Sequence, residues 1–371
     1  MKIGCVKEIK KHEYRVGCTP ATVAAYIKAG HQFFIETGAG VGSGFNDDKY
    51  QAVGAVIIDQ PAEIWNTVDM MIKVKEPLDS EYTYFREGLI LYTYLHLAAN
   101  TELTEALMKH KVTAVAYETL YDHEELPLLK PMSEVAGKLS VQEAAKSLEK
   151  PFGGSGILLG GVPGVKKGKV VIIGGGIVGV NAAKAAIGIG ADVVVLDNNL
   201  KRLAYLDDIF GNTIQTLYST DFEIEEQCKT ADVVIGAVLI PGAAAPKLVK
   251  KEYLKKMKPG SVIVDVAVDQ GGCIETTRPT YHDKPTFVVD GIVHYCVANM
   301  PGAVPRTSTM ALTNATLSYG LQIANLGIEK ALDSVVLSTA INTYQGYVTY
   351  QGVAQACQKE YVDLVTLKSK T

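Results

Sequence analysis

The sequence has few cysteines, no long apolar run and no apolar N-terminal segment, and each absence excludes a class of protein. Only six of its 371 residues are cysteine, and no two form a CxxC pair, which favours free thiols over a disulfide framework. No segment reaches the roughly 18–20 uninterrupted apolar residues of a membrane span. The N-terminus MKIGCVKEIKKHEYR lacks the apolar core of a signal peptide. We therefore expect a cytoplasmic protein that has no membrane partner.

An excess of charge of one sign is also missing. The 36 lysines and arginines nearly balance the 40 acidic residues, for a net charge of −4 without a basic block. Nucleic-acid binding therefore has little electrostatic support, and we expect no such partner. No cluster of histidine, cysteine and carboxylate has the spacing of a metal site, so we also predict no catalytic metal.

Apolar residues and glycine are plentiful, and their pattern predicts an α/β protein. A chain of 371 residues exceeds the ~250–300 residues of a single core, which predicts two domains. Strand and helix signals alternate over the first 120 residues and again from Lys169, with TFVVDGIVHYCV interpreted as the last strand. This alternation predicts two Rossmann-like, doubly wound parallel sheets. The polar passage at 125–132 is the expected boundary, Ser133 is the expected N-cap of the next helix, and residues 307–371 are expected to be helical.

The strongest local motif is VVIIGGGIVGVNAAKAAIGIGADVVVLD, residues 170–197. Gly174, Gly176 and Gly179 form G-x-G-x-x-G between an apolar strand and a helix, and Asp197 ends the next strand. Such glycines permit a tight turn, contact between the backbone and a pyrophosphate, and close packing of the helix on the strand. The acidic residue accepts hydrogen bonds from the ribose hydroxyls. The motif predicts a dinucleotide site rather than an ordinary βα turn. Asp197 favours NAD over NADP, although Lys201 and Arg202 lie close enough to weaken that preference.

A second glycine cluster, TGAGVGSGFND, does not have this spacing. Its glycines are Gly38, Gly40, Gly42 and Gly44, and Ser43 stands where a third glycine would be needed. A tight turn after a strand and a direct ligand contact are both compatible with this segment.

Three polar residues of the first half follow predicted strands, where open parallel sheets bind ligands. Arg15 lies in a loop before a helix and would suit a carboxylate, although a surface arginine is the simpler interpretation. Lys75 ends the strand MMIKVKEP, but Lys73 points to the same side and is an equal candidate. His96 ends GLILYTYLH and would suit proton transfer, whereas a lone histidine in an apolar stretch is otherwise more often structural.

The second half offers comparable residues after its later strands. Asp269 ends GSVIVDVAVD, with Asp265 inside the strand, and Asn299 and Met300 lie in the loop HYCVANMPGAVP. A carboxylate there could orient an ammonium or a water molecule. His294 is a second candidate proton carrier, which we rank below His96.

Together these segments resemble the bacterial alanine dehydrogenases. The resemblance rests on KEIKKHEYRVGCTP, ETGAGVGSGFND, IKVKEP, LYTYLHLAAN, VIIGGGIVGVNAA and HYCVANMPGAVPRTST, and it extends from residue 1 to the C-terminus. It implies NAD-dependent, reversible deamination of L-alanine to pyruvate and ammonium by a homohexamer. It also implies a substrate domain of residues 1–128 and 308–371, an NAD domain of residues 129–307, and a cleft between the domains.

The same resemblance implies roles for individual residues. Arg15 and Lys75 would bind the substrate, and His96 and Asp269 would be catalytic. The residues expected to contact NAD are Ser133, Gly174, Gly176, Val178, Gly179, Asp197, Arg202, Ser219, Val238, Leu239, Asp269, Val297, Asn299 and Met300. Two alternatives remain open, the soluble NAD-binding part of a transhydrogenase and a non-catalytic nucleotide sensor.

Overall fold

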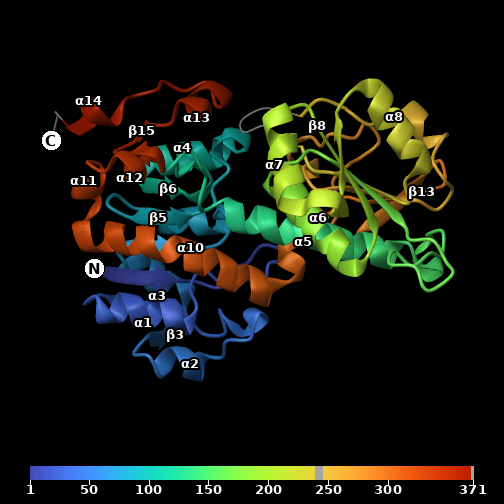
Figure 1. The fold of residues 1–371 in the computed structure, drawn as a ribbon. Helices are drawn as coiled ribbons and strands as arrows, with labels where there is room; N and C mark the ends of the chain where they lie inside the picture. Colours follow the sequence, from blue (N-terminus) through green and yellow to red (C-terminus); the bar gives the residue numbers. More distant parts are fainter. Residues whose placement is uncertain (239–244, 369–371) are drawn as a thin grey trace. The chain divides into compact units, whose positions relative to one another are not determined.

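The computed structural model describes residues 1–238 and 245–368. They fold as two compact units, one of Met1–Met132 with Val304–Thr371 and one of Ser133–Ala303. Each unit contains a mostly parallel sheet packed with helices (Figure 1). The α/β class with two parallel sheets, predicted from the alternating strand and helix signals, is confirmed.

The described residues of the first unit form an eight-stranded sheet, whose strand order is β15-β14-β6-β5-β4-β1-β2-β3. Its six parallel strands are β1 (Lys2–Cys5), β2 (Gln32–Glu36), β3 (Val56–Ile58), β4 (Met70–Ile72), β5 (Ile90–Thr93) and β6 (Thr113–Ala116). The helices between them are α1 (Pro20–Lys28), α2 (Asp47–Gln51), α3 (Pro61–Thr67) and α4 (Thr101–Lys109). Short 3-10 turns are η1 (Val41–Ser43), η2 (Asp79–Tyr84), η3 (Leu97–Ala99) and η4 (Tyr117–Thr119).

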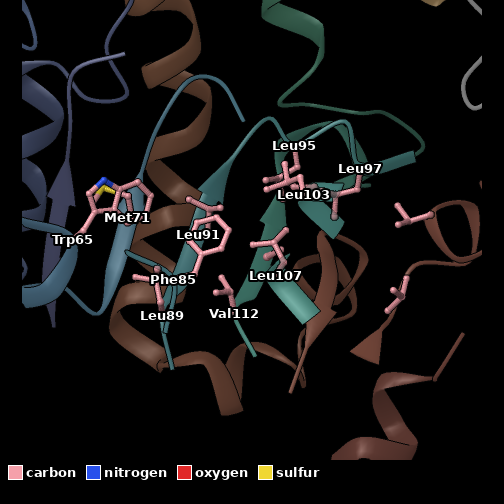
Figure 2. Packing of buried hydrophobic residues seen from close by; sticks show 14 of the residues in the cluster. Trp65, Met71, Phe85, Leu89, Leu91, Leu95, Leu97, Leu103, Leu107 and Val112 are labelled. Carbon is pink, nitrogen blue, oxygen red and sulfur yellow. The ribbon is translucent and has the colours of Figure 1, made fainter. Parts of the chain in front are cut away.

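The central strands of this sheet are buried throughout, because both faces of the sheet are covered. Every residue of β4, β5 and β6 is buried, which explains their continuous apolar sequences. One core cluster joins these strands to α3, α4 and the neighbouring turns (Figure 2). Its labelled members are Trp65, Met71, Phe85, Leu89, Leu91, Leu95, Leu97, Leu103, Leu107 and Val112. This packing fixes the strand ends from which the candidate site residues emerge.

The C-terminal part of the first unit is mostly but not wholly helical. Its helices are α10 (Pro305–Leu326), α11 (Ile328–Ala331), α12 (Val335–Thr339), α13 (Gln351–Ala356) and α14 (Leu364–Lys368). Between α12 and α13, β14 (Ile341–Tyr344) and β15 (Tyr347–Val348) form an antiparallel hairpin, and β14 pairs with β6. The expectation of a purely helical C-terminus is therefore wrong at this hairpin. Its turn residues Gln345 and Gly346 have φ of 49° and 88°, as a tight hairpin turn requires.

The described residues of the second unit form a seven-stranded sheet, whose strand order is β12-β13-β11-β10-β7-β8-β9. Its strands are β7 (Lys169–Ile173), β8 (Asp192–Asp197), β9 (Gln215–Tyr218), β10 (Val233–Gly236), β11 (Val262–Asp265), β12 (Thr286–Val289) and β13 (Ile292–Tyr295). Its helices are α5 (Lys130–Ser147, which starts in the first unit), α6 (Ile177–Ile189), α7 (Leu200–Phe210), α8 (Asp221–Thr230) and α9 (Lys251–Leu254). The 3-10 turns are η5 (Lys150–Phe152), η6 (Gly211–Thr213), η7 (Val268–Gln270) and η8 (Met300–Ala303).

Two local predictions for this unit are corrected. The segment interpreted as one strand is the hairpin β12–β13, because Asp290 and Gly291 adopt φ of 49° and 77° and reverse the chain. Ser133 lies within the first turn of α5 and is not its N-cap, because the helix already begins at Lys130.

Candidate active site

Three residues predicted to bind or act on the substrate lie in loops at one edge of the sheet of the first unit. The strands β1, β4, β5 and β6 are parallel neighbours, so their C-terminal ends lie along the same edge. Arg15 follows β1, Lys75 follows β4 and His96 follows β5. The hydroxyl of Thr93, at the end of β5, donates to the carbonyl of Lys75 at 3.1 Å and ties two of these loops together.

Arg15 is held in a fixed orientation by Glu13. Only 2% of Arg15 is exposed, and its Nε and Nη2 each donate to a different carboxylate oxygen of Glu13 at 2.6 Å. Nη1 lies 3.1 Å from the sulfur of Met132. A bidentate pair of this kind locks the guanidinium plane. Arg15 is therefore a buried, preoriented cation rather than a mobile surface side chain.

The structure separates the two lysines between which the sequence could not choose. Lys73 is 1% exposed, and its ammonium lies 3.2 Å from Glu8 and 3.0 Å from Glu81. Burial alone would lower the pKa of Lys73, but the two carboxylates outweigh burial and raise it above the ordinary value. Lys73 thus forms a buried structural ion pair with Glu8 and Glu81.

Lys75 is in a different environment. It is half-buried, and its ammonium has no hydrogen bond or ion pair within the part of the chain that the structure describes. Its backbone is held by Glu8, whose Oε1 accepts from the amides of Val74 at 2.6 Å and Lys75 at 3.2 Å. Burial, and then the neighbouring Arg15, lower the pKa of Lys75. An ammonium in this position is available to a ligand oxygen.

These two environments predict opposite effects on stability. Lys73→Met leaves Glu8 and Glu81 buried without a cation and should cost about 3–5 kcal/mol. The lowered pKa of Lys75 means that its charged form is less favourable in the native than in the unfolded chain at neutral pH. Lys75→Met should therefore leave the stability unchanged or raise it. Thermal unfolding of both variants tests this contrast, and equal losses would contradict it.

His96 lies at the surface of the first unit in an unusual backbone conformation. It is exposed, with φ of 50° and ψ of 38° in the left-handed region. Its ring lies almost parallel to that of Tyr94, at 9° with 6.0 Å between centroids. Its amide donates to Oε1 of Glu118 at 2.6 Å. His96 is thus an accessible imidazole on a restrained loop and not a core histidine.

The glycine cluster at 38–44 supports the loop that carries Arg15. A Cβ on Gly42 would lie 2.8 Å from the carbonyl oxygen of Tyr14. The hydroxyl of Ser43 donates to that carbonyl at 3.0 Å and lies 2.8 Å from the hydroxyl of Thr309. The structure therefore favours a packing role for this segment.

In the second unit the glycine motif has the geometry that a dinucleotide needs. Gly174 has φ of 101°, which favours glycine. A Cβ on Gly176 would meet nothing within 4 Å, which leaves open space at the N-terminus of α6. A Cβ on Gly179 would lie 1.9 Å from the carbonyl oxygen of Gly174, so only glycine allows the helix to approach the turn. These features fit a bound pyrophosphate.

The side chains of Asp197 and Arg202 both form hydrogen bonds with the backbone of this glycine turn. Asp197 Oδ2 accepts from the amide of Gly175 at 2.7 Å, and Oδ1 accepts from the amide of Asn199 at 2.8 Å. Nε of Arg202 donates to the carbonyl of Gly175 at 2.5 Å. A carboxylate has about four lone-pair sites, so Asp197 keeps acceptor capacity for ribose hydroxyls.

The structure describes the positions of all but one of the other residues expected at the nucleotide. Ser219 follows β9, and its amide donates to the carbonyl of Asp197 at 3.0 Å. Asp269 does not end a strand as predicted, because β11 already ends at Asp265 and exposed Asp269 lies in the following turn, η7. Met300 begins η8. The remaining positions are Ser133 in α5, Val178 in α6, Val238 after β10, and Val297 and Asn299 after β13. Leu239 lies outside the described residues.

Two alternative candidates of the second unit are structural. His294 is fully buried, its Nδ1 donates to the carbonyl of Ile292 at 2.9 Å, and its Nε2 accepts from the hydroxyl of Thr276 at 2.8 Å. Burial lowers the pKa of His294, so the neutral ring is favoured. Asp265 is also buried and accepts from the hydroxyl of Thr277 at 2.6 Å, and burial raises its pKa.

Sequence reasoning missed the glutamates that hold these loops. Glu8 follows β1 and holds the Lys75 backbone, Glu13 holds the Arg15 side chain, and Glu118 follows β6 and holds His96. Their positions after strands were a usable signal, but their partners were not predicted. Over residues 1–238 and 245–368, no group of three or more possible metal ligands is found, and no helix is long and apolar enough to cross a membrane.

Comparison with known proteins places both units in one family. Residues 4–136 match the family described as alanine dehydrogenase/PNT, N-terminal domain, and residues 140–351 match its C-terminal domain. The chain is 58% identical to alanine dehydrogenase of Bacillus subtilis (strain 168), over 98% of this chain and 96% of that protein.

Solved structures are similar as well. An L-alanine dehydrogenase structure, 51% identical, superimposes with a TM-score of 0.94 over 96% of this chain and 99% of its own. A transhydrogenase from Sinorhizobium meliloti, 24% identical, shares the fold with a TM-score of 0.82, over 95% of this chain and 99% of its own.

Proposed function

The chain belongs to the alanine dehydrogenase/PNT family, and from that premise we propose that it is an NAD-dependent L-alanine dehydrogenase. The reaction converts L-alanine, NAD⁺ and water to pyruvate, ammonium, NADH and a proton, and it is reversible. The observation that carries the proposal is the edge of the first sheet, where an oriented arginine, a half-buried lysine ammonium and an accessible imidazole follow neighbouring strands.

We assign NAD to the second unit, on the glycine turn and Asp197. The open space at Gly176 and the amides at the start of α6 suit the pyrophosphate, and Asp197 suits the adenosine ribose. When bound, NAD supplies the hydride acceptor. Residues 129–307 form the NAD domain in this proposal, and residues 1–128 with 308–371 form the substrate domain.

Each candidate residue has a role that follows from its charge and surroundings. Arg15 binds the carboxylate of alanine, because it is a buried cation whose guanidinium is held in a fixed orientation by Glu13. Lys75 donates to the substrate oxygen and stabilises negative charge that develops there. His96 and Asp269 transfer protons to and from the water that adds to the substrate imine. Binding in a fixed orientation supplies a large part of the rate enhancement.

A single assay separates this function from the two alternatives. Purified protein is mixed with L-alanine and NAD, and NADH formation is followed by absorbance. Turnover with no second nucleotide supports the dehydrogenase. Activity only with a second nucleotide would support a transhydrogenase component, and NAD binding without turnover would support a sensor.

The proposal includes a cytoplasmic homohexamer. All six cysteines are free thiols in the structure, as expected for a reducing compartment, and the resemblance to alanine dehydrogenases suggests six subunits. Light scattering coupled to gel filtration measures the mass, and a monomer of 39.8 kDa would contradict the assembly.

Gly42→Ala should weaken alanine binding without affecting NAD. The new Cβ would lie 2.8 Å from the Tyr14 carbonyl oxygen, so the loop that carries Arg15 must shift. We expect KM for alanine to rise roughly tenfold or more, since small misplacements are costly. Gly188→Ala is a matched control, because its Cβ would meet nothing within 4 Å. An unchanged KM in Gly42→Ala would contradict the supporting role of this segment.

A further inference from the structure

We propose that Glu118 is a positioning residue for His96, and that its carboxylate holds the left-handed backbone from which the imidazole projects. This inference rests on the proposed function, in which His96 is the proton carrier. Glu118 does not act on the substrate in this proposal. It acts only through His96.

The contacts of Glu118 are directed at the residue before His96 and at His96 itself. Oε1 accepts from the amide of His96 at 2.6 Å and from the amide of Leu95 at 3.2 Å, and Oε2 also accepts from Leu95 at 3.2 Å. Because β5 and β6 are parallel neighbours, the carboxylate after one strand reaches the loop after the other. It therefore bridges two adjacent strand ends.

The backbone of His96 needs such a restraint. Its φ of 50° and ψ of 38° are disfavoured for a residue with a Cβ. The next turn, η3, is anchored by buried Leu97 and by the amide of Ala99, which donates to the His96 carbonyl at 3.0 Å. On the N-terminal side Glu118 supplies the restraint. Without the carboxylate, His96 can relax to a common backbone conformation, and its ring then leaves its place beside Tyr94.

A charged acceptor suits this purpose better than a neutral one. Hydrogen bonds to a carboxylate are shorter and stronger than those to a neutral oxygen, and the His96 contact of 2.6 Å is short for an amide donor. Glu118 is half-buried, which limits competition from water. Glutamine retains one acceptor oxygen, so it should preserve part of the restraint.

The first experiment compares Glu118→Ala, Glu118→Gln and the control Glu102→Ala in the full-length protein. Glu102 is an exposed glutamate of α4. We expect kcat for alanine oxidation to fall about 10- to 100-fold in Glu118→Ala, less in Glu118→Gln, and not in the control. The Kd for NAD, measured by fluorescence, should not change in any variant. A kcat within about twofold of wild type in Glu118→Ala overturns the proposal.

The second experiment is a double-mutant cycle with His96→Ala, read as residual turnover at high enzyme concentration. If Glu118 acts through His96, Glu118→Ala should lower the residual turnover of His96→Ala by less than about twofold. An equal fall in both backgrounds would assign Glu118 a general structural role and overturn the inference. Wild-type turnover in His96→Ala would instead refute the proposed function of His96, so the two failures are distinct. If Glu118→Ala does not fold, Glu118→Asp replaces it in the cycle. Aspartate keeps the charge but is one methylene shorter.

Discussion

Replacing His96 by alanine should reduce the turnover of L-alanine by about 10²–10⁴-fold, the range for loss of a general acid–base group. His96 is exposed and lies on the first unit, whereas the nucleotide motif belongs to the second. The Kd for NAD should therefore stay within about twofold of wild type, since no nucleotide contact is removed. Steady-state kinetics and a fluorescence titration with NAD provide the two measurements.

His123→Ala is a matched control for this prediction. His123 has φ of 47° and a side chain that is 96% exposed, so it shares the backbone conformation and the exposure of His96. It comes after β6, and none of the residues proposed to contact alanine follows that strand. Robust turnover in His96→Ala, or an equal loss in His123→Ala, would show that His96 is not the proton carrier.

Replacing Asp197 by alanine should weaken NAD binding by about 10- to 100-fold, since hydrogen bonds to a charged acceptor contribute roughly 1.5–3 kcal/mol. The substitution removes the proposed ribose acceptor, which is the same carboxylate that accepts from the amides of Gly175 and Asn199. NADP should lose less affinity than NAD or gain some, because a negative charge near the 2′-phosphate is removed. Titration with both nucleotides measures this change in preference.

Asp208→Ala serves as the control, because Asp208 is an exposed carboxylate on α7. An equal loss of affinity for NAD and NADP in Asp197→Ala would mean that Asp197 acts by holding the glycine turn alone. The ribose assignment would then be rejected, while the structural contact with Gly175 would remain.

Local sequence signals indicated the parts of the candidate site that depend on residues close together in the chain. The glycine motif with Asp197 is a case of this kind, because its turn, helix start and following strand lie within 28 residues, 170–197. Position after an apolar strand made His96 a candidate and made Lys75 and Lys73 equal candidates, because the end of a strand is visible in the sequence. Their proposed roles await the experiments above.

Contacts between distant residues were not predictable in this way. Strand alternation in the sequence placed Lys73 and Lys75 on the same side, and only the positions of Glu8 and Glu81 show that Lys73 is neutralised. Glu118 lies 22 residues from His96, and no local pattern pairs them. The hairpins β12–β13 and β14–β15 were missed because their turns, Asp290-Gly291 and Gln345-Gly346, were not recognised as chain reversals.

The hairpin β14–β15 has a consequence for how the chain is synthesised. Ile341 of β14 pairs with Val115 of β6, so the strand that precedes Glu118 receives its second neighbour only when the last part of the chain has emerged from the ribosome. Until then one edge of the nascent first sheet has unpaired amides and carbonyls, which favour association with other strands. The second unit is continuous in sequence, from Ser133 to Ala303, and can be completed earlier. A ribosome that stalls before residue 341 would therefore yield a chain whose second unit is complete and whose first unit is incomplete and prone to aggregate.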